Sequence, residues 1–250
     1  MCIRDRHYHM YYFRLQHHDN AVIENSKISE KNKIQNNQSM LDDIMNSTQY
    51  PKQLQELALK NEEALEFVYD YPTEHVKEHT IDLTEEASMD SVPLFVQWDK
   101  RWGYEKYSGN FFAASGCGPT TLSMVVVYLT HNREASPIAV AKYSKEAGYS
   151  VDGSGSSWTL ISEGCMHYGV KAKAVALDES RMKAELDEGH PIVVNVGLGD
   201  FTDTGHFMVI TGYDDEGFSI NDPNSIEKSG KRWLFKNISS QIRAVWSMYV

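Results

Sequence analysis

The stretch that decides the fold is Ser-Gly-Cys-Gly-Pro-Thr-Thr at residues 115–121, which places Cys117 between two glycines directly before an apolar run. That run, residues 120–128, predicts a buried helix, and Pro119 suits the first turn of such a helix. A thiol at a helix N-terminus lies beside unpaired backbone N–H groups and the positive end of the helix dipole. Both favour the thiolate, so the stretch predicts a reactive cysteine.

Around this helix the first half of the chain reads as helical and the second half as strands. Helices are expected at residues 137–147, 158–168 and 179–188, each followed closely by a glycine. Strands are expected at 171–176, 192–196, 207–213, 217–220 and 244–250, with a hairpin turn at 214–217. A helical lobe packed on an antiparallel sheet is an α+β architecture, and this is the predicted fold class.

The first 91 residues divide into two parts that differ in composition. Residues 1–48 are rich in Asn, Gln, Lys, His and Ser, and we expect them to be a disordered stalk because they bury too little apolar surface. Residues 49–91 predict a helical pre-domain and its connector, since Leu54, Leu57, Leu59 and Leu65 recur at roughly helical spacing and the helix is expected to end before Pro72. The main domain is expected at residues 92–250.

Composition narrows the range of functions. The formal net charge is -11, and no basic run follows the first few residues, so a nucleic-acid partner is not expected. The 3 cysteines form neither a disulfide framework nor a metal knuckle, and no metal or other cofactor is predicted. No apolar run is long enough to span a membrane. Residues 1–6 resemble a translated sequencing-adapter string, so an upstream signal or anchor is left open.

A cysteine nucleophile needs a base that is adjacent in space, and a histidine at the end of a strand supplies one. His206 precedes the strand at 207–213, whereas His131, His167 and His190 lie in positions typical of surface or structural residues. The histidines before residue 20 fall in the stalk and are treated as incidental. The alternative for Cys117 is a small buried residue at a tight turn, which is the commoner role of a cysteine.

The hairpin turn at 214–217 would pair Tyr213 with Phe218 and return Asp222 to the neighbourhood of His206. A carboxylate there can hold the imidazole tautomer and stabilise its cation. Taken alone, an Asp before Pro is more typical of a turn. Asn221 is the alternative orienting residue, but strand alternation points it to the opposite face.

Four further residues are candidates for the rest of the site. The side-chain amide of Gln97 is placed to complete an oxyanion hole together with the amide of Cys117. Gly116 and Gly118 would let a substrate carbonyl approach closely. Trp158, at the end of a glycine-rich loop, is equally consistent with a cleft wall and with the core.

Taken together and in this order, these motifs resemble the papain-like family of bacteriocin-processing (double-glycine leader) peptidases, in its stand-alone secreted or cell-surface form. The resemblance covers residues 92–250 and includes Gln97, the 115–121 motif, Trp158, Gly205-His206-Phe207 and Asn221-Asp222-Pro223. It implies a catalytic set of Cys117, His206, Asp222 and Gln97, and a substrate site lined by Gly116, Gly118, Trp158 and Gly205. The chain lacks the transporter domains of the best-known members, so double-glycine specificity is not carried over.

The expected reaction is acyl transfer through a thioester, with a peptide or protein as substrate and a monomer as the working form. A secreted or cell-surface location follows from the resemblance. One alternative is a cell-wall peptide amidase or peptidoglycan hydrolase that uses the same triad. The other is a peptide-binding module that keeps the fold without turnover.

Overall fold

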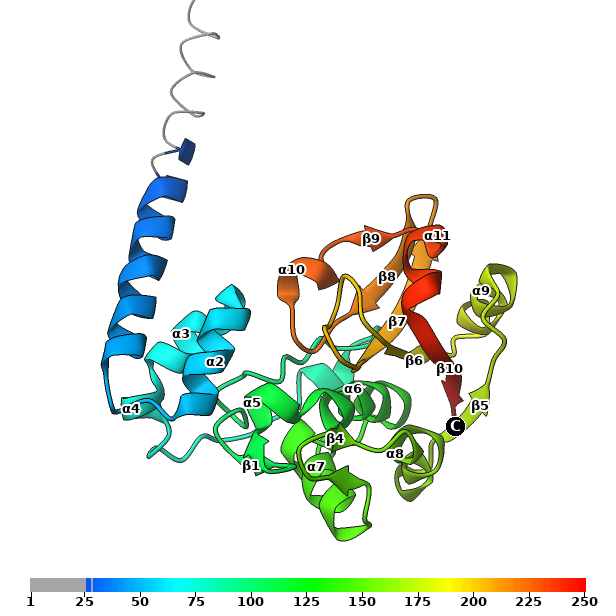
Figure 1. Ribbon diagram of the computed structural model, residues 1–250. Coiled ribbons are helices and arrows are strands. Elements are labelled where there is room, and N and C mark those ends of the chain that lie inside the picture. Colours follow the sequence, from blue (N-terminus) through cyan, green and yellow to red (C-terminus); the bar gives the residue numbers. More distant parts are fainter. Residues whose placement is uncertain (1–25, 28) are drawn as a thin grey trace, which may run out of the picture.

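A six-stranded antiparallel sheet and a group of helices around one buried helix form the main body of the chain (Figure 1). The structure is a computed structural model, and it describes residues 26, 27 and 29–250. The elements of the first half are a helix at residues 29–46, α2 (Lys52–Lys60), η1 (Glu62–Ala64), α3 (Leu65–Tyr69), α4 (Tyr71–Glu74), η2 (Glu86–Ser88), β1 (Lys106–Tyr107), β2 (Asn110–Phe111), α5 (Phe112–Ser115), α6 (Cys117–Thr130) and α7 (Pro137–Glu146). Those of the second half are β3 (Ser150–Val151), β4 (Gly155–Ser156), α8 (Thr159–Ser162), η3 (Gly164–Tyr168), β5 (Lys171–Ala174), α9 (Glu179–Asp187), β6 (Ile192–Val196), β7 (His206–Asp214), β8 (Gly217–Asn221), α10 (Ile226–Ser229), β9 (Arg232–Trp233), α11 (Phe235–Ile238), η4 (Ser239–Gln241) and β10 (Ile242–Tyr249).

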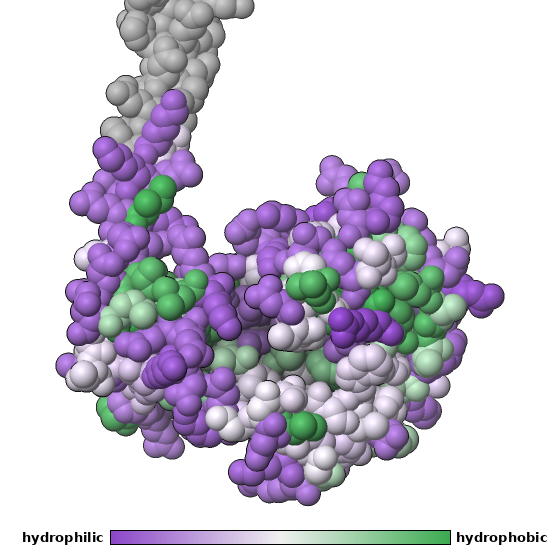
Figure 2. Space-filling model, in the orientation of Figure 1, coloured by the Kyte–Doolittle hydropathy of each residue, from purple (hydrophilic) through white to green (hydrophobic). Residues whose placement is uncertain are grey.

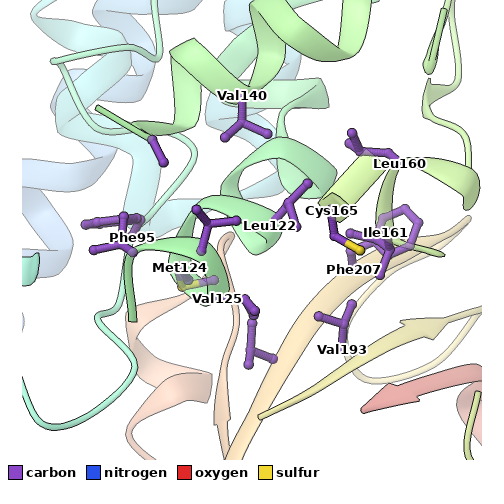
Figure 3. Close-up of a cluster of buried hydrophobic side chains, with 14 of the residues drawn as sticks. Phe95, Leu122, Met124, Val125, Val140, Leu160, Ile161, Cys165, Val193 and Phe207 are labelled. Carbon is purple, nitrogen blue, oxygen red and sulfur yellow. The ribbon is translucent and has the colours of Figure 1, made fainter. Parts of the chain in front are cut away.

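Both faces of the sheet are covered, which explains why its central strands read as continuous apolar runs. The strand order is β5-β10-β6-β7-β8-β9, and all five residues of β6 are buried. Val193, Phe207 and Val209 face one cluster, shared with α6, α7 and α8, and Figure 3 shows part of it. Ile192 and Val194 face the other cluster, shared with α9 and α11. The predicted fold class, a helical lobe packed on an antiparallel sheet, is therefore confirmed.

Helix α6 forms because burial outweighs local propensity. Ten consecutive residues, Gly118 to Val127, are buried. Three of them are valines, each of which costs less than about 0.7 kcal/mol in helix propensity relative to alanine. Burying a valine side chain contributes about 1.5–3 kcal/mol, so packing against the sheet decides the conformation. The helix ends at Thr130, and His131, which follows it, adopts a left-handed conformation with φ 54°.

The hairpin that carries the predicted base and acid forms as expected. Strand β7 pairs with β8, Tyr213 lies opposite Phe218 and Asp214 opposite Gly217. Gly217 has φ 132°, a conformation that L side chains rarely adopt. A register shift between Ile210 and Gly212 is the irregularity that the sequence pattern did not predict.

The structure corrects the sequence interpretation in the N-terminal part. Residues 1–25 of the predicted stalk lie outside the described residues, but residues 29–46 form a helix rather than a disordered segment. The reason is tertiary: Ile44 is fully buried, and Met40 and Leu41 pack against the cluster formed by α2 and α3. A polar segment therefore gains enough buried surface to order, which its composition alone did not indicate.

Two smaller corrections concern the predicted helical pre-domain. Helical structure continues beyond Pro72 into α4, because proline is tolerated in the first turn of a helix. Leu59 is 58% exposed and does not belong to the buried face. Leu83 and Ala87 of the connector pack in the main core, while the domain boundary at residue 92 stays a prediction. No helix within the described part of the chain is long and apolar enough to cross a membrane.

Candidate active site

Cys117 is the first residue of α6 and is partly exposed. The imidazole of His206 and the backbone amides of Phe207 and Gly118 lie close enough to its sulfur to act on the pKa of the thiol. Burial alone would raise the pKa of the thiol, but the hydrogen bond to His206, the charge of His206 and the two amide donors lower it below its ordinary value. The positive end of the α6 dipole acts in the same direction. The site therefore favours the thiolate.

The glycines on either side of Cys117 are explained by packing. A Cβ on Gly116 would lie 2.6 Å from the ring of Phe112, and one on Gly118 would lie 2.5 Å from the hydroxyl of Ser156. Gly116 has an ordinary φ of -85°, so backbone strain is not the reason for it. Close packing of α5 and of the 156–160 segment around the start of α6 thus requires both glycines, whatever their role toward a substrate.

Two side chains fix α6 to the strand that carries His206. Thr121 in α6 donates from Oγ1 to the backbone carbonyl of Phe207 at 3.1 Å, and the bond is buried. On the neighbouring strand β6, Asn195 donates from Nδ2 to the carbonyl of His206 at 3.2 Å. His206 itself is 6% exposed and opens β7. The thiol and the imidazole are therefore presented by two elements that are joined through the core.

Asp222 follows β8 directly and is completely buried. His206 Nε2 lies 2.7 Å from Asp222 Oδ1, which leaves Nδ1 of the imidazole for the thiol. The same carboxylate oxygen accepts the backbone N–H of Asn224 at 2.8 Å. The structure thus brings Cys117, His206 and Asp222 together from α6, β7 and the end of β8.

The pKa of the His206 imidazole shifts in the direction opposite to that of the Cys117 thiol. Burial would lower the pKa of the imidazole, but the charge of Asp222, the hydrogen bond to it and the contact with Cys117 together raise the pKa above its ordinary value. A lowered thiol pKa and a raised imidazole pKa describe one coupled thiolate–imidazolium pair. Perturbed groups of this kind in contact are typical of functional sites.

Two buried oxygen atoms at the site have no hydrogen-bond partner. Asp222 Oδ2 and Gln97 Oε1 are the two buried side-chain nitrogen or oxygen atoms that lack a hydrogen-bond partner within the described part of the chain. Buried polar atoms are satisfied in the great majority of cases, so two orphans in one place are informative. A carboxylate that lacks solvation interacts more strongly with a neighbouring cation, which reinforces the imidazolium of His206.

Gln97 lies between α5 and the loop after Asp222. Its Nε2 donates to the carbonyl of Ala113 at 2.7 Å, and its backbone N–H donates to the carbonyl of Pro223 at 2.7 Å. A side-chain amide carries two N–H groups, and the bond to the Ala113 carbonyl uses one of them. These contacts hold Gln97 beside the helix turn that leads into Cys117.

The other predicted residues are placed as follows. Trp158 is 46% exposed and its ring meets that of Trp246 at 6.0 Å, so it lies on the surface rather than in the core. Gly205 is exposed, and an added Cβ would meet only the Val196 carbonyl at 4.0 Å. Asn221 points away from the imidazole and donates to the carbonyls of Val92 and Pro93, each at 3.1 Å.

The competing histidines take structural positions. His131 bonds the carbonyl of Ala87 at 2.7 Å, His167 stacks on Tyr143, and His190 lies 3.3 Å from Glu185. Within the residues that the structure describes, no group of three or more His, Cys, Asp or Glu side chains is arranged to hold a metal ion.

Sequence reasoning missed the residues that support the site. Asn195 interrupts the apolar run of β6, which was a signal for a buried polar contact. Thr121 belongs to the 115–121 motif but has no property that marks it by itself. Asn224 and Glu63, which act on the loop after Asp222, gave no local signal because their partners lie far away in the sequence.

Comparison with known proteins gives one family and several solved structures. A family model described as "Peptidase_C39 like family" matches residues 89–250, which is more than half of the 250-residue chain. No curated protein sequence matches the chain. The peptidase domain of Streptococcus ComA, a bi-functional ABC transporter involved in a quorum sensing pathway, aligns with 19% identity and a TM-score of 0.45, over 63% of this chain and 96% of that one. A protein described as a C39-like peptidase from Bacillus anthracis aligns with 17% identity and a TM-score of 0.39, over 64% of this chain and 95% of that one.

Proposed function

The chain belongs to the Peptidase C39-like family, and we propose that it is a cysteine peptidase that hydrolyses peptide bonds through Cys117, His206 and Asp222. The observation that carries the proposal is the buried contact between His206 Nε2 and the carboxylate of Asp222, at 2.7 Å, with Cys117 close enough to the same imidazole that each group shifts the pKa of the other. The opposite pKa shifts of thiol and imidazole support an ion pair that is ready to attack a carbonyl.

In the proposed reaction the Cys117 thiolate adds to the carbonyl carbon of a peptide bond. The negative charge that develops on the carbonyl oxygen is stabilised by the backbone amide of Cys117 and the second N–H of Gln97. Collapse of the tetrahedral intermediate breaks the C–N bond, and the imidazolium of His206 gives its proton to the departing amine. A thioester between Cys117 and the acyl part of the substrate remains.

Water then resolves the thioester. His206, now neutral, takes a proton from the water as it adds to the thioester carbonyl, and the C–S bond breaks to release a carboxylic acid. Throughout both steps Asp222 holds Nε2 of the ring and stabilises the imidazolium. A peptide or protein substrate, a monomeric state and a secreted or cell-surface location remain predictions of the same proposal.

Cleavage of a mixed peptide library, followed by mass spectrometry, tests the proposal. We expect the full chain to cleave and the Cys117→Ala variant to lose cleavage to background, because alanine has no nucleophile. Cys165→Ala is the matched control, since Cys165 is a fully buried core residue with no part in the proposed reaction, and it should retain cleavage.

Cleavage by the Cys117→Ala variant would overturn the mechanism. Hydrolysis of purified cell-wall peptides without cleavage of library peptides would replace the substrate class with that of a wall-peptide amidase. Absence of any hydrolysis, together with equally slow alkylation of Cys117 and Cys165, would leave a peptide-binding module.

A further inference from the structure

The loop that follows Asp222, residues 223–227, lies against the N-terminal helical region, residues 29–74. A cavity of about 610 Å³ runs along this contact, and its lining includes Lys33, Glu63, Asn224 and Lys228. Figure 2 shows hydrophilic surface on the N-terminal helix and on the facing part of the molecule. Polar side chains of the N-terminal region reach across this contact to the loop, more than 160 positions away in the sequence.

Glu63 makes three of these contacts with one carboxylate. Its Oε1 accepts the hydroxyl of Ser225, and its Oε2 accepts the backbone N–H groups of Ile226 at 2.8 Å and Glu227 at 3.1 Å. Ser225 is 5% exposed, and it also caps α10 by accepting the N–H of Lys228. Hydrogen bonds to an ionised acceptor are stronger than neutral ones, so Glu63 fixes the path of residues 225–227.

Asn61 makes a second, separate contact. Its Nδ2 donates to the backbone carbonyl and to the side-chain Oδ1 of Asn224, both at 3.0 Å. Its Oδ1 accepts the N–H of Glu63 at 3.0 Å and so caps η1. Trp98 donates to the same Asn224 carbonyl at 3.2 Å. One asparagine thus links the turn that presents Glu63 with the residue two positions after Asp222.

The loop transmits this restraint directly to the carboxylate. The N–H of Asn224 donates to Asp222 Oδ1 at 2.8 Å, and the same oxygen receives His206 Nε2. The N–H of Ser225 donates to the backbone carbonyl of Asp222 at 3.2 Å. A displacement of residues 224 and 225 would therefore move both the donor that orients the carboxylate and the backbone that carries it.

From these contacts we propose that Glu63 and Asn61 are positioning residues of the active site, through which the N-terminal helical region holds Asp222 against His206. The inference rests on the proposed function, because it assigns these residues to the proposed catalytic acid. Neither residue touches the thiol or the imidazole. Substituting them should therefore shift the pKa values of the Cys117–His206 pair without removing either of its two side chains.

The test is the pH dependence of Cys117 alkylation by iodoacetamide in the full chain, followed by mass spectrometry of the labelled peptide. The charged groups that face His206 are Cys117 and Asp222. Loosening Asp222 stabilises the imidazolium less and hence the thiolate less, so the acid limb of alkylation should move to higher pH. In Glu63→Ala we expect about three- to tenfold slower alkylation on that limb, since one pH unit is tenfold in thiolate fraction.

Conservative variants and a control sharpen the result. Glu63→Gln keeps one acceptor oxygen and should fall between the original chain and Glu63→Ala. Asn61→Ser keeps an oxygen that can cap η1 but removes the donor to Asn224, and it should shift the limb in the same direction. Glu66→Ala is the matched control, because Glu66 is exposed and makes no hydrogen bond to the loop among the described residues. Its limb should stay in place.

The role is overturned if the acid limbs of Glu63→Ala and Asn61→Ser coincide with that of Glu66→Ala in folded protein, even where the melting temperature falls. A double variant gives an independent check: if Glu63 acts through Asp222, Glu63→Ala should shift the limb no further once Asp222→Ala is present. Additive shifts would contradict the proposal. Alkylation needs no substrate, so failure to cleave peptides would reject the proposed function while this measurement still decides the positioning role.

Discussion

The beginning of α6 and the η3 turn each carry a free cysteine, and the two regions treat the same side chain in opposite ways. Cys117 lies partly exposed at the helix N-terminus beside His206, and the pKa of its thiol is lowered. Cys165 is fully buried, and burial raises the pKa of its thiol to about 11. Reactivity therefore follows from what surrounds the sulfur rather than from the presence of a cysteine.

The difference between the two regions is one of partners. Cys165 lies in the apolar cluster that contains Ile161 and Phe207, and Figure 3 shows its sulfur among these side chains. The amides of Cys165 and Met166 approach the sulfur, but they do not offset burial. At Cys117 the imidazole of His206 and two backbone amides together do offset the effect of burial on the pKa of the thiol. With amide donors alone the pKa of a buried thiol stays raised, whereas an imidazole beside the thiol lowers it.

The largest expected effect is the contrast in alkylation between the two sulfurs. A thiol of pKa about 11 has a thiolate fraction of about one in ten thousand at pH 7, and Cys165 is in addition fully buried. We expect iodoacetamide to label Cys117 at least about a thousand times faster than Cys165 in the folded protein. Peptide mapping over time measures both rates, and denaturation should remove the difference. Similar rates in the folded state would refute the contrast.

The second-largest expected effect tests how Asp222 supports the imidazolium of His206. Asp222→Asn keeps the size of the side chain but removes the charge that raises the pKa of His206. We expect kcat/KM for a cleaved peptide to fall by about a hundredfold or more, in line with the loss of an oriented general base. Asp215→Asn removes an equal charge at the exposed hairpin turn and should leave kcat/KM unchanged. Equal effects of the two substitutions would argue against a specific role for Asp222.

The pH profile is a third way to examine the pair. Because the thiol pKa is lowered and the imidazole pKa is raised, the ion pair exists above the first and below the second. We expect a bell-shaped kcat/KM whose acid limb lies below the ordinary pKa of a thiol and whose alkaline limb lies above that of an imidazole, each changing about tenfold per pH unit. In Asp222→Asn the alkaline limb should move to lower pH. An unmoved limb would separate Asp222 from the titration of His206.

The smallest effect concerns the second cysteine. Cys165→Ser keeps the shape of the side chain but places an O–H group among apolar neighbours in a fully buried position. We expect the free energy of unfolding to fall by about 1–3 kcal/mol, the cost of burying a hydroxyl without a full set of partners. Urea denaturation measures it, and Cys165→Ala separates the cost of polarity from that of lost volume. An unchanged free energy of unfolding in Cys165→Ser would contradict the expected cost of the buried hydroxyl.

Local patterns were enough for most of the fold. The apolar run after Pro119 predicted α6, and the turn residues at 214–217 predicted both the hairpin and the pairing of Tyr213 with Phe218. The helix at residues 29–46 and the short elements between residues 225 and 241 were not predicted. Their order depends on packing against distant parts of the chain, which a window of neighbouring residues does not contain.

By itself the sequence determined the longer helices and strands of residues 117–250, and it placed a cysteine at a helix start and a histidine at a strand start. Periodicity and turn chemistry act over a few residues, so they can be read without the tertiary structure. The hairpin pairing and strand alternation already favoured Asp222 over Asn221 as the partner of His206. Only the tertiary structure decided that Asn61 and Glu63 hold the loop beyond it. Those contacts join residues up to 164 positions apart, and chain folding alone brings such residues together.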